Sequence, residues 1–447
     1  MSGLLSIPVE TVHLIAAYLP IDDLCALRLT CRDMNAETLG WFARRYFHTR
    51  YVMLERESLN TLIRISEHPR LGPEVRTLGF CTERLLEPDD GLEEENSFWE
   101  TVAGDMAGDS DSDEPDGWLE WERDAGLWPG DDGFLDQSAA VISRRYFDDQ
   151  ESFFSGPDVA ALTRAMSGLY NCKTLLLTDA HPPWGAVRME REVGELGRGL
   201  AHDAIGDESF VKHVIDVMLT AARESQLPVE ELCIELGKES KISAGDPISL
   251  HLLDSPPESI ARQPNSNHLI GLTTLKLIAS PVIEDESEED EAVPGWPRNF
   301  SRFLGLFPQL SHFSLAFSGD FDYGIASSCL LDVLSLPRLR KLELTRIDTV
   351  EAQLTGFLLR HESTLEEIVL DKVKMTGRIS WTTLLEKSKQ MPGVHSMTLK
   401  DCWLFSCSRP GYMYDYELET VCMRNEKDFE HAIAMVEGLG TVWDVEE

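Results

Sequence analysis

Residues capable of chemistry are scattered along the 447-residue sequence and do not gather into a known catalytic motif. His181 precedes a proline and His202 precedes Asp203, settings that are typical of loop histidines and not of metal ligands. The sequence has no phosphate-binding Gly-x-x-x-x-Gly-Lys loop, no His-Glu-x-x-His zinc motif and no Gly-x-Ser-x-Gly nucleophile elbow. We therefore expect a protein that is not an enzyme. An enzyme whose site has no recognised motif is the alternative.

The cysteines also give no sign of a shared site. There are nine of them, no two form a Cys-x-x-Cys pair, and Cys402 and Cys407 come closest to a paired spacing. A zinc site or a disulfide framework would need regular pairs. The N-terminus lacks a basic region, and no apolar run reaches the roughly 18 residues that a membrane span needs. We expect no metal, no cofactor, and an intracellular location in the cytoplasm or nucleus.

Net charge narrows the class of partner. Lys and Arg number 40 against 78 Asp and Glu, which gives a formal net charge of −38. Because like charges repel, we expect no binding to nucleic-acid backbones or to anionic membranes. The excess is concentrated between Glu87 and Asp136, where 19 acidic residues accompany the single basic residue Arg123, and in a second run from Glu284 to Glu291.

These two acidic runs lack apolar periodicity, which is typical of loops. We interpret them as insertions into a folded domain, at about residues 83–151 and 284–294. Solubilising loops are the simpler interpretation. A contact with a basic substrate is the alternative, because the first run contains Trp99, Trp118, Trp121 and Trp128.

Helical patterns occupy the first 50 residues. Pro8 suits a first helical turn, and Pro20 would end that helix. Between them an apolar stripe consists of Val12, Ile15 and Leu19. Asp22 is a good cap for a second helix, and a third is expected over Met34–Phe47. About 40 residues in three short helices expose more apolar surface than they can bury, so a partner is expected. An ordinary helical cap on a larger domain is the alternative.

The same stretch resembles an F-box. The family pattern of Leu-Pro-x-Glu, Ile, aromatic-Leu-Pro, Asp-Leu, Leu-Arg and Cys-Arg is matched at fixed spacing by Ile7, Pro8, Glu10, Ile15, Tyr18, Leu19, Pro20, Asp23, Leu24, Leu27, Arg28, Cys31 and Arg32. Departures include Thr11 at an apolar place and Met34 where tryptophan is frequent. The resemblance implies docking on a Skp-type adaptor and, through it, on a cullin. The residues that it implies for adaptor binding are Ile7, Pro8, Ile15, Leu19, Pro20, Leu24, Leu27 and Cys31.

Beyond this stretch one apolar phrase recurs eight times. Its copies are VRTLGF, CKTLLL, VEELCI, LTTLKL, LSHFSL, LRKLEL, LEEIVL and VHSMTL. The central anchors at positions 313, 342, 368 and 397 are 29, 26 and 29 residues apart, which matches the leucine-rich-repeat range of roughly 20 to 29. The earlier gaps are longer, at 97, 57, 43 and 38 residues, and the acidic runs account for two of them.

Helical periodicity precedes most of these phrases, as over residues 158–169 and 208–222. Each unit is therefore expected to be a helix followed by a strand, and parallel strands joined by helical crossovers build a curved solenoid. The predicted fold class is α/β, with a three-helix F-box over residues 1–50 and an irregular leucine-rich-repeat-like solenoid over residues 51–447. A compact α/β domain is the alternative.

The whole chain resembles an F-box protein of the fungal type with degenerate leucine-rich repeats. This implies a substrate-recognition subunit of a Skp-cullin-F-box ubiquitin ligase, with an adaptor-bound scaffold outside a ligase as the alternative. In an x-Leu-x-Leu-x strand the x positions point to the inner sheet face. The candidate client-binding residues there are Lys276, His312, Lys341, Glu343, Glu367, Asp371 and Lys400. Client binding by the insertions or by residues 403–447 is the alternative.

Overall fold

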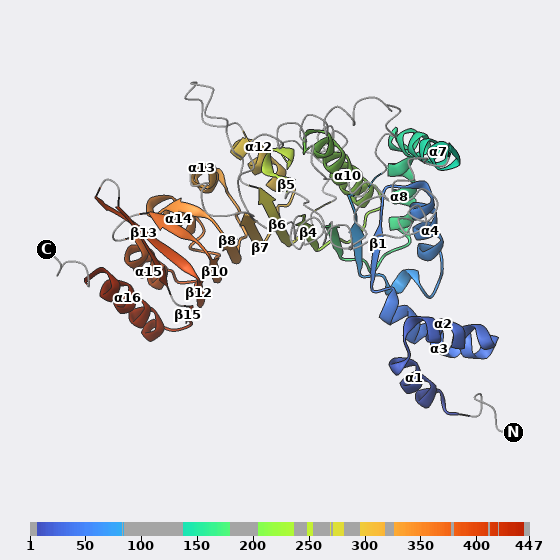
Figure 1. The fold of residues 1–447 in the computed structure, drawn as a ribbon. Coiled ribbons are helices and arrows are strands. Elements are labelled where there is room, and N and C mark those ends of the chain that lie inside the picture. Colours follow the sequence, from blue (N-terminus) through green and yellow to red (C-terminus); the bar gives the residue numbers. More distant parts are fainter. Residues whose placement is uncertain are drawn as a thin grey trace, which may run out of the picture.

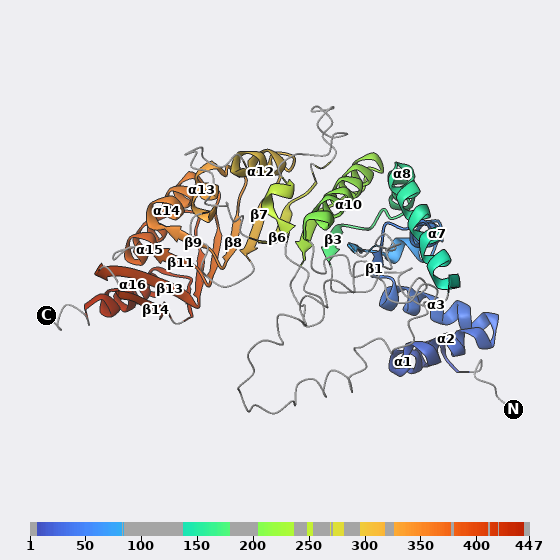
Figure 2. The ribbon, with the colours of Figure 1, turned by 45° about the horizontal axis from the view of Figure 1, so that its top comes forward.

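The repeats form an arch. The computed structural model describes residues 7–82, 84, 137–178, 204–236, 248–253, 269, 271–280, 296–317, 326–376, 380–409, 412–418 and 420–441. Strands run along the inside of the arch and helices along its outside, as two views show (Figures 1 and 2). Three further helices project from its N-terminal end. An α/β fold with N-terminal helices was predicted, and it is confirmed.

The projecting helices are α1 (Val9–Tyr18), α2 (Ile21–Thr30) and α3 (Arg32–Tyr46). Pro8 and Pro20 stand immediately before α1 and α2, where the missing N–H of a proline costs no helical hydrogen bond. Cys31 stands immediately before α3, and its Sγ accepts a hydrogen bond from the backbone N of Met34 at 3.5 Å. The chain then passes from α3 into the first strand of the arch.

The main sheet of the described chain has the strand order β1-β2-β3-β4-β6-β7-β8-β10-β12-β15, with β5 (Ile248–Ser249) paired to β6. Its parallel strands are β1 (Thr49–Val52), β2 (Thr77–Phe80), β3 (Thr174–Thr178), β4 (Glu231–Glu235), β6 (Thr274–Ser280), β7 (His312–Phe317), β8 (Lys341–Thr345), β10 (Glu367–Asp371) and β12 (Ser396–Lys400). All eight predicted strands are confirmed. Because each main strand pairs with its successor, the sheet is elongated and not a compact α/β core. The antiparallel β15 (Val421–Met423) lies at its far edge.

Helices connect these strands and cover one face of the sheet (Figure 2). They are α4 (Arg56–Ser66), α7 (Gln137–Phe154), α8 (Pro157–Ser167), α10 (Ala204–Glu224), α12 (Trp296–Leu304), α13 (Ala326–Val333), α14 (Glu351–Arg360) and α15 (Ser380–Gln390), with short 3-10 turns η2 (Gly72–Glu74) and η3 (Leu250–Leu253). α16 (Glu426–Thr441) follows β15. No helix in the described ranges is both long and apolar enough to cross a membrane.

Helix α7 corrects the boundary of the first insertion. Residues 137–151 were assigned to that insertion, yet they form most of α7. The helix is tied to the arch because Phe153 is buried in the core and Asp149 pairs with Arg56 of α4 at 2.9 Å. The rest of the two predicted insertions, residues 85–136 and 284–294, lies outside the described residues.

Repeated backbone hydrogen bonds fix the strand register. The carbonyl of Ser311 accepts bonds from the backbone N of Arg340 at 2.8 Å and of Lys341 at 2.9 Å. One repeat later the carbonyl of Arg340 accepts from Glu366 and Glu367 in the same way. This pair of hydrogen bonds to one carbonyl aligns each strand with its neighbour. The leucines therefore point toward the helices, and the alternate residues form the inner face.

A second sheet, which the sequence analysis did not predict, runs beside the main one. Its strands are β9 (Asp348–Val350), β11 (Lys374–Thr376), β13 (Cys402–Arg409) and β14 (Tyr412–Leu418). Arg346, Lys372 and Asp401 make the turns into the first three of these strands with φ values of 56°, 53° and 48°. Single residues in this left-handed region redirect the chain sharply. The C-terminal repeats thus each contribute a strand to both sheets.

Candidate protein-interaction surfaces

The N-terminal helical module has a small interior. Its buried apolar side chains are Val12, Ala16, Leu24, Met34 and Ala43, and none of them belongs to the continuous core of the arch. Polar contacts hold α1 onto α3. His13 Nε2 lies 2.9 Å from the carbonyl oxygen of Glu37, and Arg45 Nη1 donates to the carbonyl of Ala17 at 2.8 Å. Several large apolar side chains of α1 and α2 are left on the outside.

The residues implied for adaptor binding do not all lie on the outer surface of the α1–α3 module. Pro8, Ile15 and Pro20 are exposed, and Ile7, Leu19, Leu27 and Cys31 are half-buried. Leu24 is 0% exposed in this chain, so it is the one buried member of the set. It belongs to the small interior of the module and supports the outer surface from beneath.

Exposed apolar residues absent from the predicted set complete the outer surface. They are Val9, Leu14, Tyr18, Ile21 and Leu29, with Tyr18 88% and Leu29 86% exposed. We call these five residues together with Ile15 the α1–α2 apolar patch. Both helices carry apolar residues on more than one side, so helical periodicity could not distinguish the buried side from the open side. Large exposed apolar side chains that gather on one small module mark an interaction site.

The inner face of the arch brings the candidate client-binding residues together. Lys341 Nζ lies 2.8 Å from Glu343 on its own strand and 3.2 Å from Glu367 on the next. His312 Nε2 lies 3.5 Å from the same carboxylate of Glu343. His312 and then Lys341 lower the pKa of Glu343 to about 2, because both favour its charged form. Glu343 is therefore ionised at neutral pH.

The same pairing extends to both sides. Lys276 Nζ lies 2.7 Å from Glu231, and Lys400 Nζ lies 3.2 Å from Asp371. The hydrogen bond to Glu231 is the main cause that raises the pKa of Lys276. Each lysine of the candidate set is therefore already matched by a carboxylate of this chain. A client would have to exchange these partners, which limits how much a purely ionic contact can contribute.

The first four strands give the inner face a different character. Strand register places Tyr51, Gly79, Leu176 and Cys233 side by side in one row. Burial, followed by the charge of Glu231, raises the pKa of the Cys233 thiol to about 12, so the group stays neutral and acts as an apolar side chain. The repeat pattern in β1 is too short to recognise, so this row was missed. The register of β2, β3 and β4 was the available signal.

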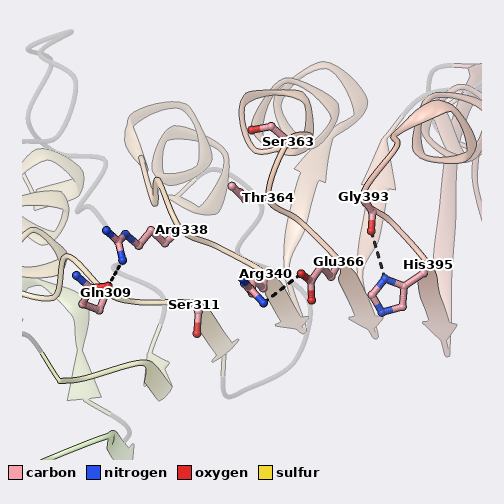
Figure 3. Close-up of a pocket in the computed structure, with 9 residues that line it drawn as sticks. All are labelled: Gln309, Ser311, Arg338, Arg340, Ser363, Thr364, Glu366, Gly393 and His395. Atoms are coloured by element: carbon pink, nitrogen blue, oxygen red, sulfur yellow. Dashed lines mark hydrogen bonds and ion pairs between the residues drawn. The ribbon is translucent and has the colours of Figure 1, made fainter.

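A polar groove lies along the edge of the sheet where the strands begin (Figure 3). It has a volume of about 720 Å³ and is lined by Gln309, Ser311, Arg338, Arg340, Ser363, Thr364, Glu366, Gly393 and His395. Arg340 pairs with Glu366 at 3.4 Å, and Arg338 donates to Gln309. These side chains satisfy one another across neighbouring repeats. Their arrangement contains no nucleophile beside a base.

Comparisons with known proteins leave the family open. No protein-family model matches the chain, and no curated protein matches its sequence. Within the described ranges, no group of three or more His, Cys, Asp or Glu side chains is arranged to hold a metal ion.

Proposed function

We propose that this chain is the substrate-recognition subunit of a Skp-cullin-F-box ubiquitin ligase, with α1–α3 docking on the Skp-type adaptor and the arch selecting a protein client. The observation that carries the proposal is the α1–α2 apolar patch, on a module that projects from the arch (Figure 1). The match of residues 7–32 to the F-box pattern supports it. In this role the chain would need neither a catalytic group nor a cofactor of its own.

Energetics favour a partner on this patch. Burying apolar surface contributes about 25 cal/mol per Å², so a fully covered Leu or Ile side chain contributes roughly 1.5–3 kcal/mol. Six large apolar side chains, four of them Leu or Ile, are exposed on two helices of ten residues each. The module has only a few buried residues of its own. An adaptor that covers the patch would bind and also stabilise the module.

The arch would contribute by positioning. Ubiquitin transfer to a held client needs a high local concentration of the client lysine near a charged conjugating enzyme, and a rigid receptor provides it without reacting groups. Continuous strand pairing from β1 to β12 and a shared core running from Phe47 to Val436 make the arch one extended body. A client on its inner face would be held at a fixed distance from the adaptor.

Co-purification with a Skp-type adaptor tests the proposal. The variant Ile15→Glu with Leu29→Glu places charges on both helices at exposed positions, so the module should still fold. The loss of two apolar contacts and the burial of two charges should weaken binding at least a hundredfold. Leu359→Glu is the matched control, because Leu359 is 41% exposed on α14 and Ile15 is 39% exposed. Wild-type recovery of the adaptor by the double variant would refute the docking assignment.

Recovery of a cullin and the response of the client level to proteasome inhibition distinguish a ligase subunit from a scaffold. The ligase predicts that the adaptor complex also recovers a cullin and that a bound client accumulates when the proteasome is inhibited. Recovery of the adaptor without a cullin would favour the scaffold that the sequence analysis left open. Either result leaves the α1–α2 apolar patch as the adaptor site.

A further inference from the structure

The polar groove at the edge where the strands begin takes its lining from successive repeats (Figure 3). We call it the strand-entry groove. Each repeat contributes a residue from the turn before its strand and a residue directly before the strand, as Arg338 and Arg340 do before β8, while Leu339 between them is buried in the core. The groove passes the first residues of β7, β8, β10 and β12, neighbouring strands that lie about 4.8 Å apart. Its length of about 14 Å corresponds to about four extended residues.

The chain does not fully neutralise the two arginines of this groove. Arg338 reaches toward the preceding repeat and donates to the amide oxygen of Gln309, which carries no charge (Figure 3). In the described part of the chain, no carboxylate is paired with Arg338. Arg340 reaches toward the next repeat, where its Nη1 lies 3.4 Å from Glu366, and the two side chains are 67% and 42% exposed. A single ion pair with this distance and exposure contributes little.

A second groove on the same edge is arranged differently. It has a volume of about 440 Å³ and lies farther toward the N-terminal end of the arch. Its lysine, Lys173, is hydrogen-bonded to Glu230 at 2.6 Å, and Glu231 is hydrogen-bonded to Lys276 at 2.7 Å. Arg76 is the single arginine in its lining. The strand-entry groove therefore differs in presenting two arginines from one repeat.

The rest of the strand-entry groove suits a peptide backbone. None of its nine lining residues has a large apolar side chain. Ser311 and Thr364 donate their hydroxyl hydrogens to carbonyls of this chain, so both oxygens can still accept a hydrogen bond. His395 Nδ1 lies 3.2 Å from the carbonyl oxygen of Gly393, which places the proton of the neutral ring on Nδ1 and leaves Nε2 as an acceptor. A Cβ at Gly393 would be 2.7 Å from the carbonyl oxygen of Leu365, so bare backbone lines the groove at this point.

The acidic character of the chain does not decide the charge of this groove. Residues 87–136 carry a surplus of 18 negative charges and residues 284–291 carry 7, which together make 25 of the net 38. Charges farther away than about 8 Å are largely screened at physiological ionic strength. Local groups therefore determine which ligand the groove prefers. Planar guanidinium groups bind carboxylates through paired, charge-assisted hydrogen bonds.

We propose that the strand-entry groove binds an extended acidic segment of a partner protein, with Asp or Glu carboxylates on Arg338 and Arg340. An incoming carboxylate would supply the negative charge that Gln309 lacks and would compete with Glu366 for Arg340. The hydroxyls and His395 would accept hydrogen bonds from the backbone N–H groups of the segment. As a client site, this assignment rests on the proposed function. As a peptide site, it rests on the groove alone.

Peptide binding to the purified full chain, measured by fluorescence anisotropy, tests the inference. The probe is a fluorescent peptide of about ten residues in which Glu alternates with Gly or Ser, and its companion carries Gln at every Glu position. The acidic probe should bind, and the companion should bind at least about tenfold more weakly, because it lacks the charge-assisted hydrogen bonds. The variant Arg338→Ala with Arg340→Ala should bind the acidic probe as weakly as the companion. Both arginines are exposed, so this variant should fold normally.

Glu366→Gln gives a result that a loss of stability cannot imitate. It removes the carboxylate that competes for Arg340, so the acidic probe should bind about twofold to fivefold more tightly. Arg76→Ala is the matched control, because the carbonyl of Arg76 accepts backbone hydrogen bonds from Lys173 and Thr174 at the same position before a strand. This variant should leave binding unchanged.

Four results would overturn the inference. They are equal binding of the two peptides, wild-type affinity in the double arginine variant, weaker binding by Glu366→Gln, and a loss in Arg76→Ala as large as that in Arg340→Ala. The last result would show a diffuse effect of positive charge and not a site.

The acidic run of the chain itself is the competing occupant. A chain without residues 87–136 should bind the acidic probe within about twofold of the full chain, because a tethered competitor is absent in both. A gain of about tenfold or more on this deletion would assign the groove to the chain's own run and overturn the assignment to a partner protein.

The adaptor test remains separate. The variant Ile15→Glu with Leu29→Glu should lose the adaptor and keep the acidic probe. The variant Arg338→Ala with Arg340→Ala should keep the adaptor and lose the probe. Failure of the probe to bind any form would therefore overturn the strand-entry groove and leave adaptor docking intact.

Discussion

His361 joins two repeats through both of its ring nitrogens. Nε2 accepts a hydrogen bond from the backbone N of Leu336 at 3.0 Å, which requires the proton to be on Nδ1, and Nδ1 then donates to the carbonyl of Phe357 at 2.8 Å. The ring is buried between α14 and the segment that leads into β8. Burial lowers the pKa of His361, since the charged form would have no water and would lose the bond from Leu336.

This geometry predicts a loss of stability in mild acid. Because the folded pKa is below the unfolded value of about 6.5, only the unfolded chain takes up the proton as pH falls from 6.5 toward the folded pKa. The contribution of His361 is thus complete above about pH 6.5 and is lost below it. Thermal unfolding of His361→Leu should show a weaker decline between pH 7 and 5 than the wild type. At pH 7 this variant should be less stable by about 1–3 kcal/mol, because the N–H of Leu336 is left unpaired. Identical pH profiles would contradict the assignment.

Lys341 allows a second prediction at this scale. Its ammonium lies between Glu343 and Glu367, so Lys341→Glu would place three carboxylates side by side. We expect a loss of about 1–2 kcal/mol in the free energy of unfolding, measured by urea denaturation at neutral pH and low salt. Arg298→Glu on α12 is the control, because Arg298 is an exposed cation and should shift stability by no more than about 0.5 kcal/mol. A loss in the Lys341 variant that salt does not reduce would point to a packing effect instead.

At the scale of elements, close packing of α8 against α4 depends on glycine. A Cβ at Gly168 would be 2.7 Å from the carbonyl oxygen of Ser66, at the end of α4. Gly168→Ala should therefore separate the two helices and cost about 1–3 kcal/mol. Gly356, inside α14, has its nearest neighbour at 3.9 Å, on a flexible arginine. Gly356→Ala should instead stabilise the chain by up to about 1 kcal/mol, because alanine is the better helix former. Comparing the melting temperatures of the two variants checks both signs.

Some of these elements could be predicted from the sequence and others could not. The repeated phrase identified eight strands because two buried leucines at a spacing of two residues leave a periodic signal. β1 has only four residues, Thr49–Val52, and holds its place by pairing with β2, which periodicity does not reveal. The second sheet depends on the left-handed turns at Arg346, Lys372 and Asp401, and those residue types do not distinguish such turns. Local pattern therefore predicted the repeats, while long-range pairing determined what lies beside them.

The candidate surfaces also were predictable where local pattern decides and unpredictable where long-range contacts decide. The alternation of β8 and β10 was enough to place Lys341, Glu343 and Glu367 on one face. Their ion pairs were not predicted, because the 26-residue spacing aligns the two strands but does not say which charged ends on the shared face meet. Leu24 was expected on the adaptor surface and is buried, since the fixed spacing of a motif does not say which side of a helix faces its neighbours.

For the whole molecule, strand pairing across the first acidic run sets an expectation for its removal. β2 and β3 are direct neighbours in register, with Thr77 opposite Thr174. Yet 93 residues lie between Phe80, the last residue of β2, and Thr174, the first residue of β3. Residues 87–136 lie outside the described residues, and loop closure depends only weakly on loop length. We expect a chain without residues 87–136 to fold and to keep its melting temperature within about 3 °C. A larger drop would show that the four tryptophans of this run pack on the arch.

The arch and the N-terminal module should also unfold separately. The core of the arch begins at Phe47, and the buried residues of α1–α3 lie outside it, with Phe42 and Tyr46 of α3 packed against its edge. Leu24→Ala removes a completely buried side chain from the module and should cost it about 2–5 kcal/mol, more than so small a core can offset. The variant should lose the adaptor, while the main calorimetric transition of the arch stays unchanged. A lowered main transition would instead show that the two parts fold as one unit, and that the adaptor module and the client surface are coupled through α3.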